Sequence, residues 1–124
     1  MGGKFTKPQV ESKFFDEFAA GLPSMAGKSL AITGCTTGTG AVAARTFASK
    51  GGTVFVLNRP SERAEAALKS LKSACKDGGT VTQVDCDLQN LASVRKAAES
   101  VTSAVGASGL DVLCNNAGAS RLSC

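Results

Sequence analysis

Apolar residues follow two alternating patterns along most of this chain. Four short runs are almost continuously apolar and rich in β-branched residues, which is typical of strands buried on both faces of a sheet. Between them, apolar residues recur every three or four positions, as in helices with one buried face. The predicted strands are residues 29–33, 53–57, 80–84 and 110–114, and the predicted helices are residues 41–50, 61–79 and 88–105. This order predicts right-handed βαβ crossovers and a parallel sheet.

The third predicted helix has the clearest apolar face. Leu91, Val94, Ala98 and Val101 recur along it at spacings of three and four. We therefore expect these four side chains to pack against the sheet.

A shorter periodic segment precedes the first strand. Val10, Phe14 and Phe18 recur every four residues, and Gly21 then ends the pattern. This spacing predicts a short amphipathic helix within a leader at residues 1–26. Docking of its apolar face on the main domain is favoured over a membrane or partner contact.

Composition fits one ordinary domain. The chain has 124 residues, of which 43% are hydrophobic and 19% are charged, and its net charge is only +4. The chain has no block of basic residues that would favour a nucleic-acid partner. It also has no apolar run that approaches the ~18 residues of a membrane-spanning helix. We expect a leader at residues 1–26, a domain at 27–118 and a tail at 119–124.

Missing residue types exclude whole mechanisms. The chain has no His, Tyr or Trp. A Ser-His-Asp triad, most zinc sites and a phenolic general acid therefore have no candidates in it, and we assign no catalytic and no metal residue. The five cysteines form no Cys-x-x-Cys pair, which favours reduced thiols in the cytoplasm. Of these, Cys86 and Cys114 lie in apolar runs and are expected to be buried.

The most specific motif directly follows the first predicted strand. Glycines at such a strand-to-helix turn let a pyrophosphate approach the main-chain amides, and the helix N-terminus adds a favourable dipole. In a βαβαβ pattern this turn predicts a dinucleotide site. The residues of the turn assigned to cofactor binding are Thr33, Gly34, Thr36, Thr37, Gly38, Thr39 and Gly40.

The spacing Thr-Gly-x-x-x-Gly-x-Gly resembles the turn of the short-chain dehydrogenase/reductase family. The resemblance covers residues 28–118 and includes Asp85-Cys86-Asp87-Leu88 and Asn115-Asn116-Ala117-Gly118. It implies a Rossmann-type α/β fold, a truncated doubly wound parallel sheet of about four strands in the order 3-2-1-4. The segment at 87–95 is similar to the subgroup of retinol dehydrogenases and protochlorophyllide reductases.

The resemblance also implies roles for the two later motifs. Asp87, beside Leu88, would contact the adenine. The segment at 115–118 would steady the sheet and line the cofactor cleft, with Asn115, Ala117 and Gly118 assigned to cofactor binding. The residues themselves allow simpler alternatives. Asp87 can cap the third helix, and Asn115 and Asn116 can close the end of a strand.

The end of the second strand bears on the choice of cofactor. NAD-selective folds place an acidic residue there to hold the ribose 2′-OH. This chain instead has Asn58 and Arg59, with no acidic residue before Glu62. Arg59 can make a forked contact to a 2′-phosphate, and Thr37 can add a hydroxyl donor, so NADP(H) is predicted. Arg59 as a solvated turn residue is the alternative.

Family resemblance implies hydride transfer between NADP(H) and a carbonyl or alcohol by a Ser-Tyr-Lys centre. In the family these residues follow the Asn-Asn-Ala-Gly segment, whereas this sequence has six residues after Gly118 and no tyrosine. We therefore predict the cofactor-binding half of an oxidoreductase. The alternative is a non-catalytic dinucleotide-binding or regulatory protein that pairs with a full-length relative. In the order 3-2-1-4 the fourth strand leaves an open edge, which predicts homo- or hetero-oligomers.

The N-terminus matches an acylation pattern. Met1-Gly2-Gly3-Lys4-Phe5-Thr6 fits M-G-x-x-x-[ST], in which Gly2 receives a myristoyl chain. A single chain gives only weak membrane contact, so peripheral membrane attachment is the alternative to a purely cytoplasmic location.

Overall fold

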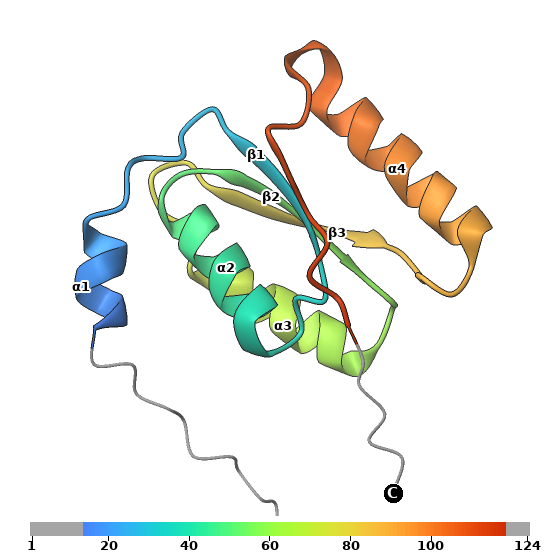
Figure 1. The fold of residues 1–124 in the computed structure, drawn as a ribbon, viewed down its shortest axis with the longest axis horizontal. Helices are drawn as coiled ribbons and strands as arrows, with labels where there is room; N and C mark the ends of the chain where they lie inside the picture. The colour runs from blue at the N-terminus through green and yellow to red at the C-terminus, as the bar shows by residue number, and fades with distance from the viewer. Residues whose placement is uncertain (1–13, 119–124) are drawn as a thin grey trace, which may run out of the picture.

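Figure 1 shows a parallel sheet with helices on both faces. The computed structural model describes residues 14–118. Its strands are β1 (Ser29–Thr33), β2 (Thr53–Asn58), β3 (Thr80–Asp85) and β4 (Val112–Cys114). They are ordered β3-β2-β1-β4, and each neighbouring pair is parallel. The predicted fold class and strand order are therefore confirmed, although β4 is shorter than the predicted 110–114.

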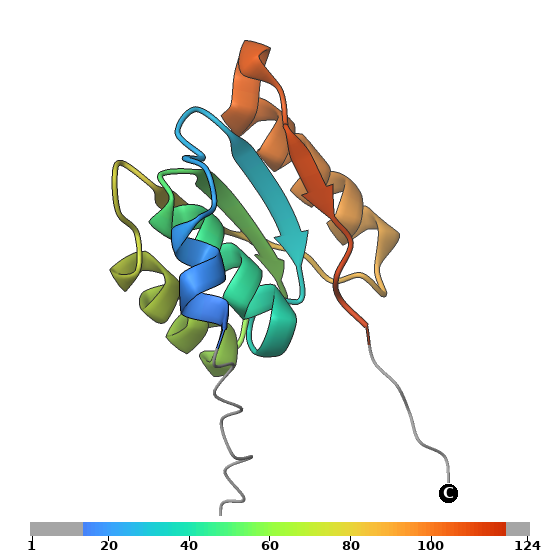
Figure 2. The ribbon, with the colours of Figure 1, turned by 60° about the vertical axis from the view of Figure 1, so that its left-hand side comes forward.

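Helices fill the connections between the strands. The connecting helices are α2 (Gly38–Ser49), α3 (Glu62–Ser73) and α4 (Leu91–Val105), with a short 3₁₀ helix η1 (Gly106–Ser108) before β4. A further helix, α1 (Phe15–Ala20), precedes β1. Figure 2 shows α2 and α3 on one face of the sheet and α4 on the other. Within residues 14–118, no helix combines the length and apolar character needed to cross a membrane.

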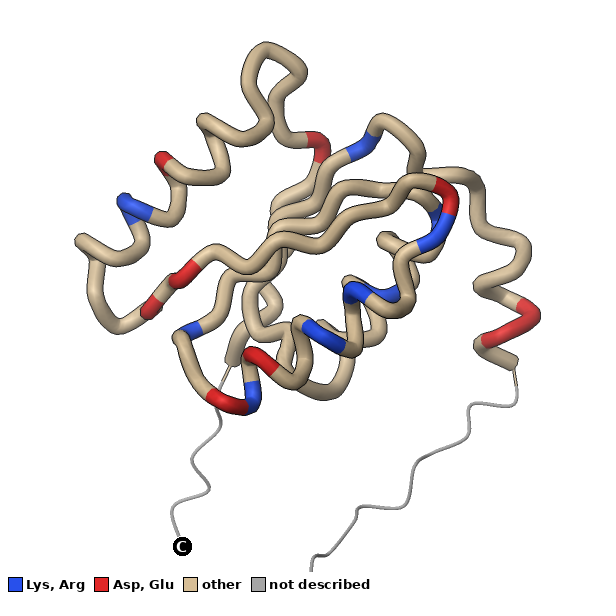
Figure 3. The backbone as a smooth tube through the Cα atoms, turned by 180° about the vertical axis from the view of Figure 1, so that it is seen from behind, with Lys and Arg blue, Asp and Glu red and all other residues tan. Residues whose placement is uncertain are grey.

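The core has two parts, one on each face of the sheet. All five residues of β1 are buried. Ile32, Val54 and Val56 are at most 1% exposed and pack with α2 and α3. On the opposite face Phe55 packs with Val101 of α4. Figure 3 shows that charged residues occupy helices, loops and the end of β3, leaving the centre of the sheet uncharged.

Helix α4 packs through only part of the predicted face, with Val101 buried and Val94 half-buried. Ala97 and Val101 are its buried residues, whereas Leu91 is 68% exposed and Ala98 is exposed. The prediction was wrong for Leu91 and Ala98. The helical face that contacts the sheet includes Ala97 and Val101, and Leu91 and Ala98 lie outside that face.

Asn90, not Asp87, caps this helix. The Asn90 side chain accepts hydrogen bonds from the main-chain N–H groups of Ala92 and Ser93, at 3.0 and 3.3 Å. The alternative in which Asp87 caps this helix is therefore wrong, and its carboxylate instead accepts from the Gln89 main-chain N–H within the loop that follows β3.

The leader helix does not dock through its phenylalanines. Phe14 and Phe18 are 76% and 64% exposed, and α1 has no buried residue. Its connection to the domain is polar, since the main-chain N–H of Met25 donates to the Lys50 carbonyl and Lys50 Nζ donates to the Ala20 carbonyl. The predicted docking of Phe14 and Phe18 is wrong, because a six-residue helix held by main-chain contacts brings neither ring to the core. Val10, the Gly2 acylation site and the tail at 119–124 lie outside the described residues.

Strand β4 leaves one side of the sheet open. In the part of the chain that the structure describes, β4 pairs with β1 alone, and its Val112 and Leu113 are 44% and 59% exposed. The start of β4 is fixed by Asp111, whose carboxylate accepts from the Ser29 main-chain N–H at 2.8 Å and from the Ser29 hydroxyl at 3.3 Å. The predicted open edge is therefore present.

Candidate functional site

The carboxyl ends of the four parallel strands meet at one edge of the sheet. Ligands of open parallel α/β sheets bind at this edge, beside the point where the strand order reverses. Here that point lies between β1 and β4. A cleft of about 620 Å³ opens there, between the loops that follow the strands. Its lining residues are Gly34, Thr36, Leu57, Asn58, Arg59, Pro60, Ser61, Arg63, Cys86, Asp87, Leu88, Gln89, Ala117 and Gly118.

Two glycines give the turn between β1 and α2 its shape. Gly34 and Gly38 have φ angles of +71° and +65°, a region that other residues adopt at a cost. A Cβ on Gly34 would lie 2.8 Å from the Cα of Ala117, so a larger residue would push the end of β4 away. A Cβ on Gly38 would meet nothing within 4 Å. The turn is therefore packed tightly at Gly34 and open at Gly38.

Asn116 holds this turn against the chain after β4. Its side-chain Nδ2 donates to the carbonyl oxygens of Thr33 and Gly34, both at 3.1 Å. Next to it, the main-chain N–H of Ala117 donates to Thr33 Oγ1 at 3.0 Å. Gly40 packs closely against the same turn, since a Cβ at this position would lie 2.3 Å from the Gly34 carbonyl oxygen. These bonds fix the path of the turn relative to the last described segment.

Asn58 holds the other side of the turn. Asn58 is 7% exposed, and its Oδ1 accepts from the main-chain N–H of Cys35 at 3.1 Å. Burial, with the nearby Cys114, raises the pKa of the Cys35 thiol to about 12. Burial also raises the pKa of Cys86, which lies at the end of β3. Both thiols are therefore neutral packing groups at neutral pH, not nucleophiles.

The cleft carries more positive than negative charge. Arg59 and Arg63 line it, and Asp87 is the acidic residue among its lining residues. The Asp87 carboxylate accepts from the main-chain N–H of Gln89 at 3.0 Å, which orients it in the loop after β3. The cleft can therefore hold an anionic ligand. The Asp87 carboxylate can also accept hydrogen bonds from donors at one end of that ligand.

The structure brings together only part of the predicted site. Eight predicted residues line the cleft, namely Gly34, Thr36, Asn58, Arg59, Asp87, Leu88, Ala117 and Gly118. The other six predicted residues, Thr33, Thr37, Gly38, Thr39, Gly40 and Asn115, are absent from its lining. Two of these six support the cleft without lining it. Thr33 contacts Ala117, and Gly40 packs against Gly34.

Sequence reasoning missed one contact and one residue of this region. Asn116 was expected to steady the sheet as part of the segment at 115–118, or to close a strand end, and the contact not foreseen is the one by which its side chain ties two loops together. Arg63 was not considered, although a basic residue one turn beyond Arg59 at the start of a helix is a visible signal. Cys86 is buried as predicted, whereas Cys114 is only half-buried.

The strand order and the glycine turn define a Rossmann-like α/β protein. A family model of short chain dehydrogenases matches residues 28–123. The chain therefore belongs to the short-chain dehydrogenase family, and the family prediction is confirmed.

Known relatives agree with this assignment. An uncharacterized oxidoreductase of Mycobacterium tuberculosis is 37% identical over 94 residues, which are 76% of this chain and 27% of the relative. The L-sorbose reductase of Gluconobacter frateurii, solved with NADPH and L-sorbose, is 34% identical with a TM-score of 0.66, covering 79% of this chain and 36% of that one. A metagenomic short-chain oxidoreductase solved with NADP is 33% identical with a TM-score of 0.67, covering 77% and 41%. The chain thus spans about a quarter of the first relative and less than half of each structure.

Proposed function

We propose that this chain forms the cofactor-binding part of an NADP(H)-dependent short-chain oxidoreductase. The observation that carries the proposal is the glycine turn at the β1–α2 junction, which opens onto a cleft lined by Arg59. The NADPH and NADP complexes of the two similar structures support the same class of ligand. Hydride transfer is the chemistry that a bound nicotinamide supplies.

The residues present fit a pyrophosphate. Gly38 at the start of α2 leaves open space where a side chain would otherwise project. The helix N-terminus beside it offers main-chain N–H groups and the positive end of the dipole. Thr36, Thr37 and Thr39 are neighbours of Gly38 in the sequence and carry hydroxyl groups that can donate to a phosphate.

The rest of the molecule extends from this point in two directions. Asp87 and Leu88 would hold the adenine, and Arg59, with Asn58 behind it, would receive the 2′-phosphate. Asn115, Ala117 and Gly118 would face the ribose on the nicotinamide side. Each of these residues except Asn115 lines the cleft. The geometry therefore supports the adenine and phosphate assignments more strongly than that of Asn115.

Cofactor titration tests the proposal. We expect the wild type to bind NADPH more tightly than NADH. Arg59 attracts the 2′-phosphate, and no acidic residue stands at the end of β2 to repel that phosphate. Arg59→Ala should lower the affinity for NADPH by about tenfold and leave that for NADH nearly unchanged. Arg45→Ala, which removes an exposed cation of α2 away from the cleft, is the control. Equal wild-type affinities for the two cofactors would refute the NADP(H) preference.

A second candidate function is dinucleotide binding without turnover. It is favoured by one observation, the absence of tyrosine from these 124 residues, so no phenol in them can serve as the proton donor. NADPH oxidation with a panel of carbonyl compounds separates the two candidates. Turnover supports the oxidoreductase, whereas tight binding with no turnover supports a binding or regulatory role.

Other expectations about the surroundings are also proposals. The four free cysteines of the described residues support a reducing compartment such as the cytoplasm. Association through the open edge of β4 is supported by the exposure of Leu113. Acylation of Gly2 rests on the sequence pattern alone, and the intact mass of the protein from its own cells tests it.

A further inference from the structure

We propose that Arg63 is a second selector for the 2′-phosphate of NADP(H), acting together with Arg59. The inference rests on the proposed function and concerns a residue that the sequence analysis did not assign. Arg59 lies in the loop after β2, and Arg63 is the second residue of α3. Both line the cleft that Gly34 and Thr36 of the glycine turn also line.

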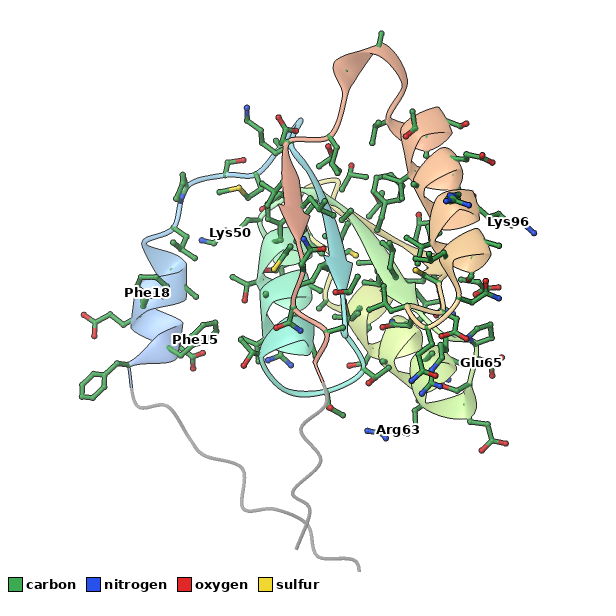
Figure 4. All side chains as sticks on the ribbon, turned by 45° about the vertical axis from the view of Figure 1, so that its right-hand side comes forward. Phe15, Phe18, Lys50, Arg63, Glu65 and Lys96 are labelled. Carbon is green, nitrogen blue, oxygen red and sulfur yellow. The ribbon has the colours of Figure 1, made fainter. Side chains whose placement is uncertain are left out.

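The first turn of α3 divides its charges between two surfaces. Arg63 lines the nucleotide cleft, whereas Glu65 lines a separate cleft between β3, α3 and α4. Figure 4 shows the two side chains on different sides of the helix. Glu62, the other acidic residue of this turn, is exposed and lines neither cleft. Arg63 therefore lines the cleft, whereas the two carboxylates of the first turn of α3 do not, and neither of them forms an ion pair with it.

Both arginines are available for a ligand. Within residues 14–118 the ion pairs comprise a single contact, between Lys28 and Asp111. Neither Arg59 nor Arg63 is held by a carboxylate in this part of the chain. Ser61 lies between them as the N-cap of α3, and its hydroxyl accepts from the Ala64 N–H at 3.0 Å. This bond fixes the start of the helix and with it the position of Arg63.

The chemistry of a phosphate monoester suits two arginines better than one. Near neutral pH such a group carries about −1.5 to −2 charges and three acceptor oxygens. A single guanidinium neutralises only part of this charge and occupies only two oxygens in a forked contact. The ribose 2′-OH of NAD carries no charge, so a second arginine favours NADP(H) specifically.

Binding measurements on the 124-residue chain test this inference. The probes are NADPH, NADH and 2′,5′-ADP, the last of which carries the 2′-phosphate without a nicotinamide. Arg63→Ala should weaken NADPH and 2′,5′-ADP by about tenfold and NADH by less than about twofold. Arg63→Lys should recover part of the loss, because it restores the charge without the fork. Lys69→Ala, which removes an exposed cation of the same helix outside the cleft, should change none of the affinities.

The outcomes separate this inference from the proposed function. A wild type that prefers NADPH, with an Arg63→Ala variant of unchanged affinity, overturns the role of Arg63 alone. Equal losses for NADPH and NADH also overturn it, since they indicate a general effect on the cleft. A wild type that binds none of the three probes overturns the proposed function and this inference together. Matching thermal unfolding of all variants shows that the differences arise at the site.

Discussion

The side-chain amide of Asn116 lies 3.1 Å from the carbonyl oxygen of Gly34, although 82 positions separate the two residues. This bond, with its counterpart to Thr33, joins the chain after the last strand to the turn after the first. The conformation of the glycine turn therefore depends on the order of the sheet as well as on its own residues. A change at Asn116 should affect both folding and cofactor binding.

Asn116→Ala should destabilise the fold by about 1–3 kcal/mol, because it leaves two carbonyl groups without their donor. It should also weaken NADPH binding, since the turn loses a support. Urea unfolding and NADPH titration measure the two effects. Asn115→Ala is the matched control for stability alone, because Asn115 is exposed and should change stability by less than about 0.5 kcal/mol. A similar loss of stability in the two variants would argue against the role given to Asn116.

Two glycines of the turn should respond differently to alanine. At Gly40 a Cβ would lie 2.3 Å from the Gly34 carbonyl oxygen and 2.5 Å from Asn116 Nδ2. Such overpacking costs about 1–3 kcal/mol, which exceeds the gain of up to ~1 kcal/mol from replacing a helical glycine. Gly40→Ala should therefore lower the free energy of unfolding, measured in urea. An unchanged or raised free energy of unfolding would mean that the turn shifts at little cost to make room for the Cβ.

Gly38→Ala should instead separate stability from binding. Its positive φ makes alanine unfavourable by about 1–2 kcal/mol, but the new methyl group meets no protein atom within 4 Å. Gly78 has a positive φ of +84° and equally open surroundings, in the loop before β3, so Gly78→Ala is a matched control for strain. Both variants should lose similar stability, and only Gly38→Ala should lose NADPH affinity. Equal affinities would place the pyrophosphate away from Gly38.

The sequence was sufficient for the order of elements but not for their contacts. Alternating strand and helix patterns predicted the parallel sheet because each pattern is local. The buried face of α4 was wrong at Leu91 and Ala98, since a periodicity of three and four also fits a face shifted by one residue. The docking of Phe18 was wrong because an apolar spacing does not show which surface lies nearby.

Contacts across the sheet were equally invisible in the sequence. The bonds of Asn116 and Asn58 to the glycine turn join residues far apart in the chain. Arg63 becomes a candidate only when α3 is placed beside the cleft. A family motif marks such residues as a group, and only the fold separates those that line the cleft from those that support it.

Asp111 should make the stability of the fold depend on pH. The main-chain N–H of Ser29 lowers the pKa of the Asp111 carboxyl group. Burial opposes this, and Lys28 and the Ser29 hydroxyl lower the pKa further. Because the folded-state pKa is depressed, the stabilisation is present above the unfolded value of about 3.9 and is lost as pH falls through the lower folded value. Asp111→Asn should thus be less stable than the wild type near neutral pH. The difference should shrink in melts at about pH 3. Glu99→Gln, an equal charge change on exposed α4, should show no such convergence.

Cys35 and Cys86 should resist alkylation in the folded protein. Cys35 is fully buried with a pKa of about 12, so almost none of it is thiolate at about pH 8. Cys86 is 3% exposed, and its pKa is also raised. Peptide mapping after timed iodoacetamide treatment should find Cys75, which is half-buried, labelled before both of them. Labelling of Cys35 as fast as Cys75 would show that the turn opens readily.

The open edge of β4 should cause concentration-dependent association. Leu113 is 59% exposed on a strand that pairs only with β1 in the described part of the chain, so main-chain groups and apolar surface lie together there. Sedimentation velocity over a range of concentrations should show the wild type associating, and Leu113→Lys should suppress this because a charge on an edge strand opposes pairing. Leu91→Lys is the matched control, since Leu91 is 68% exposed on α4, away from the edge. Suppression by both variants would indicate general charge repulsion, and a monomeric wild type would show that the edge is not used for association.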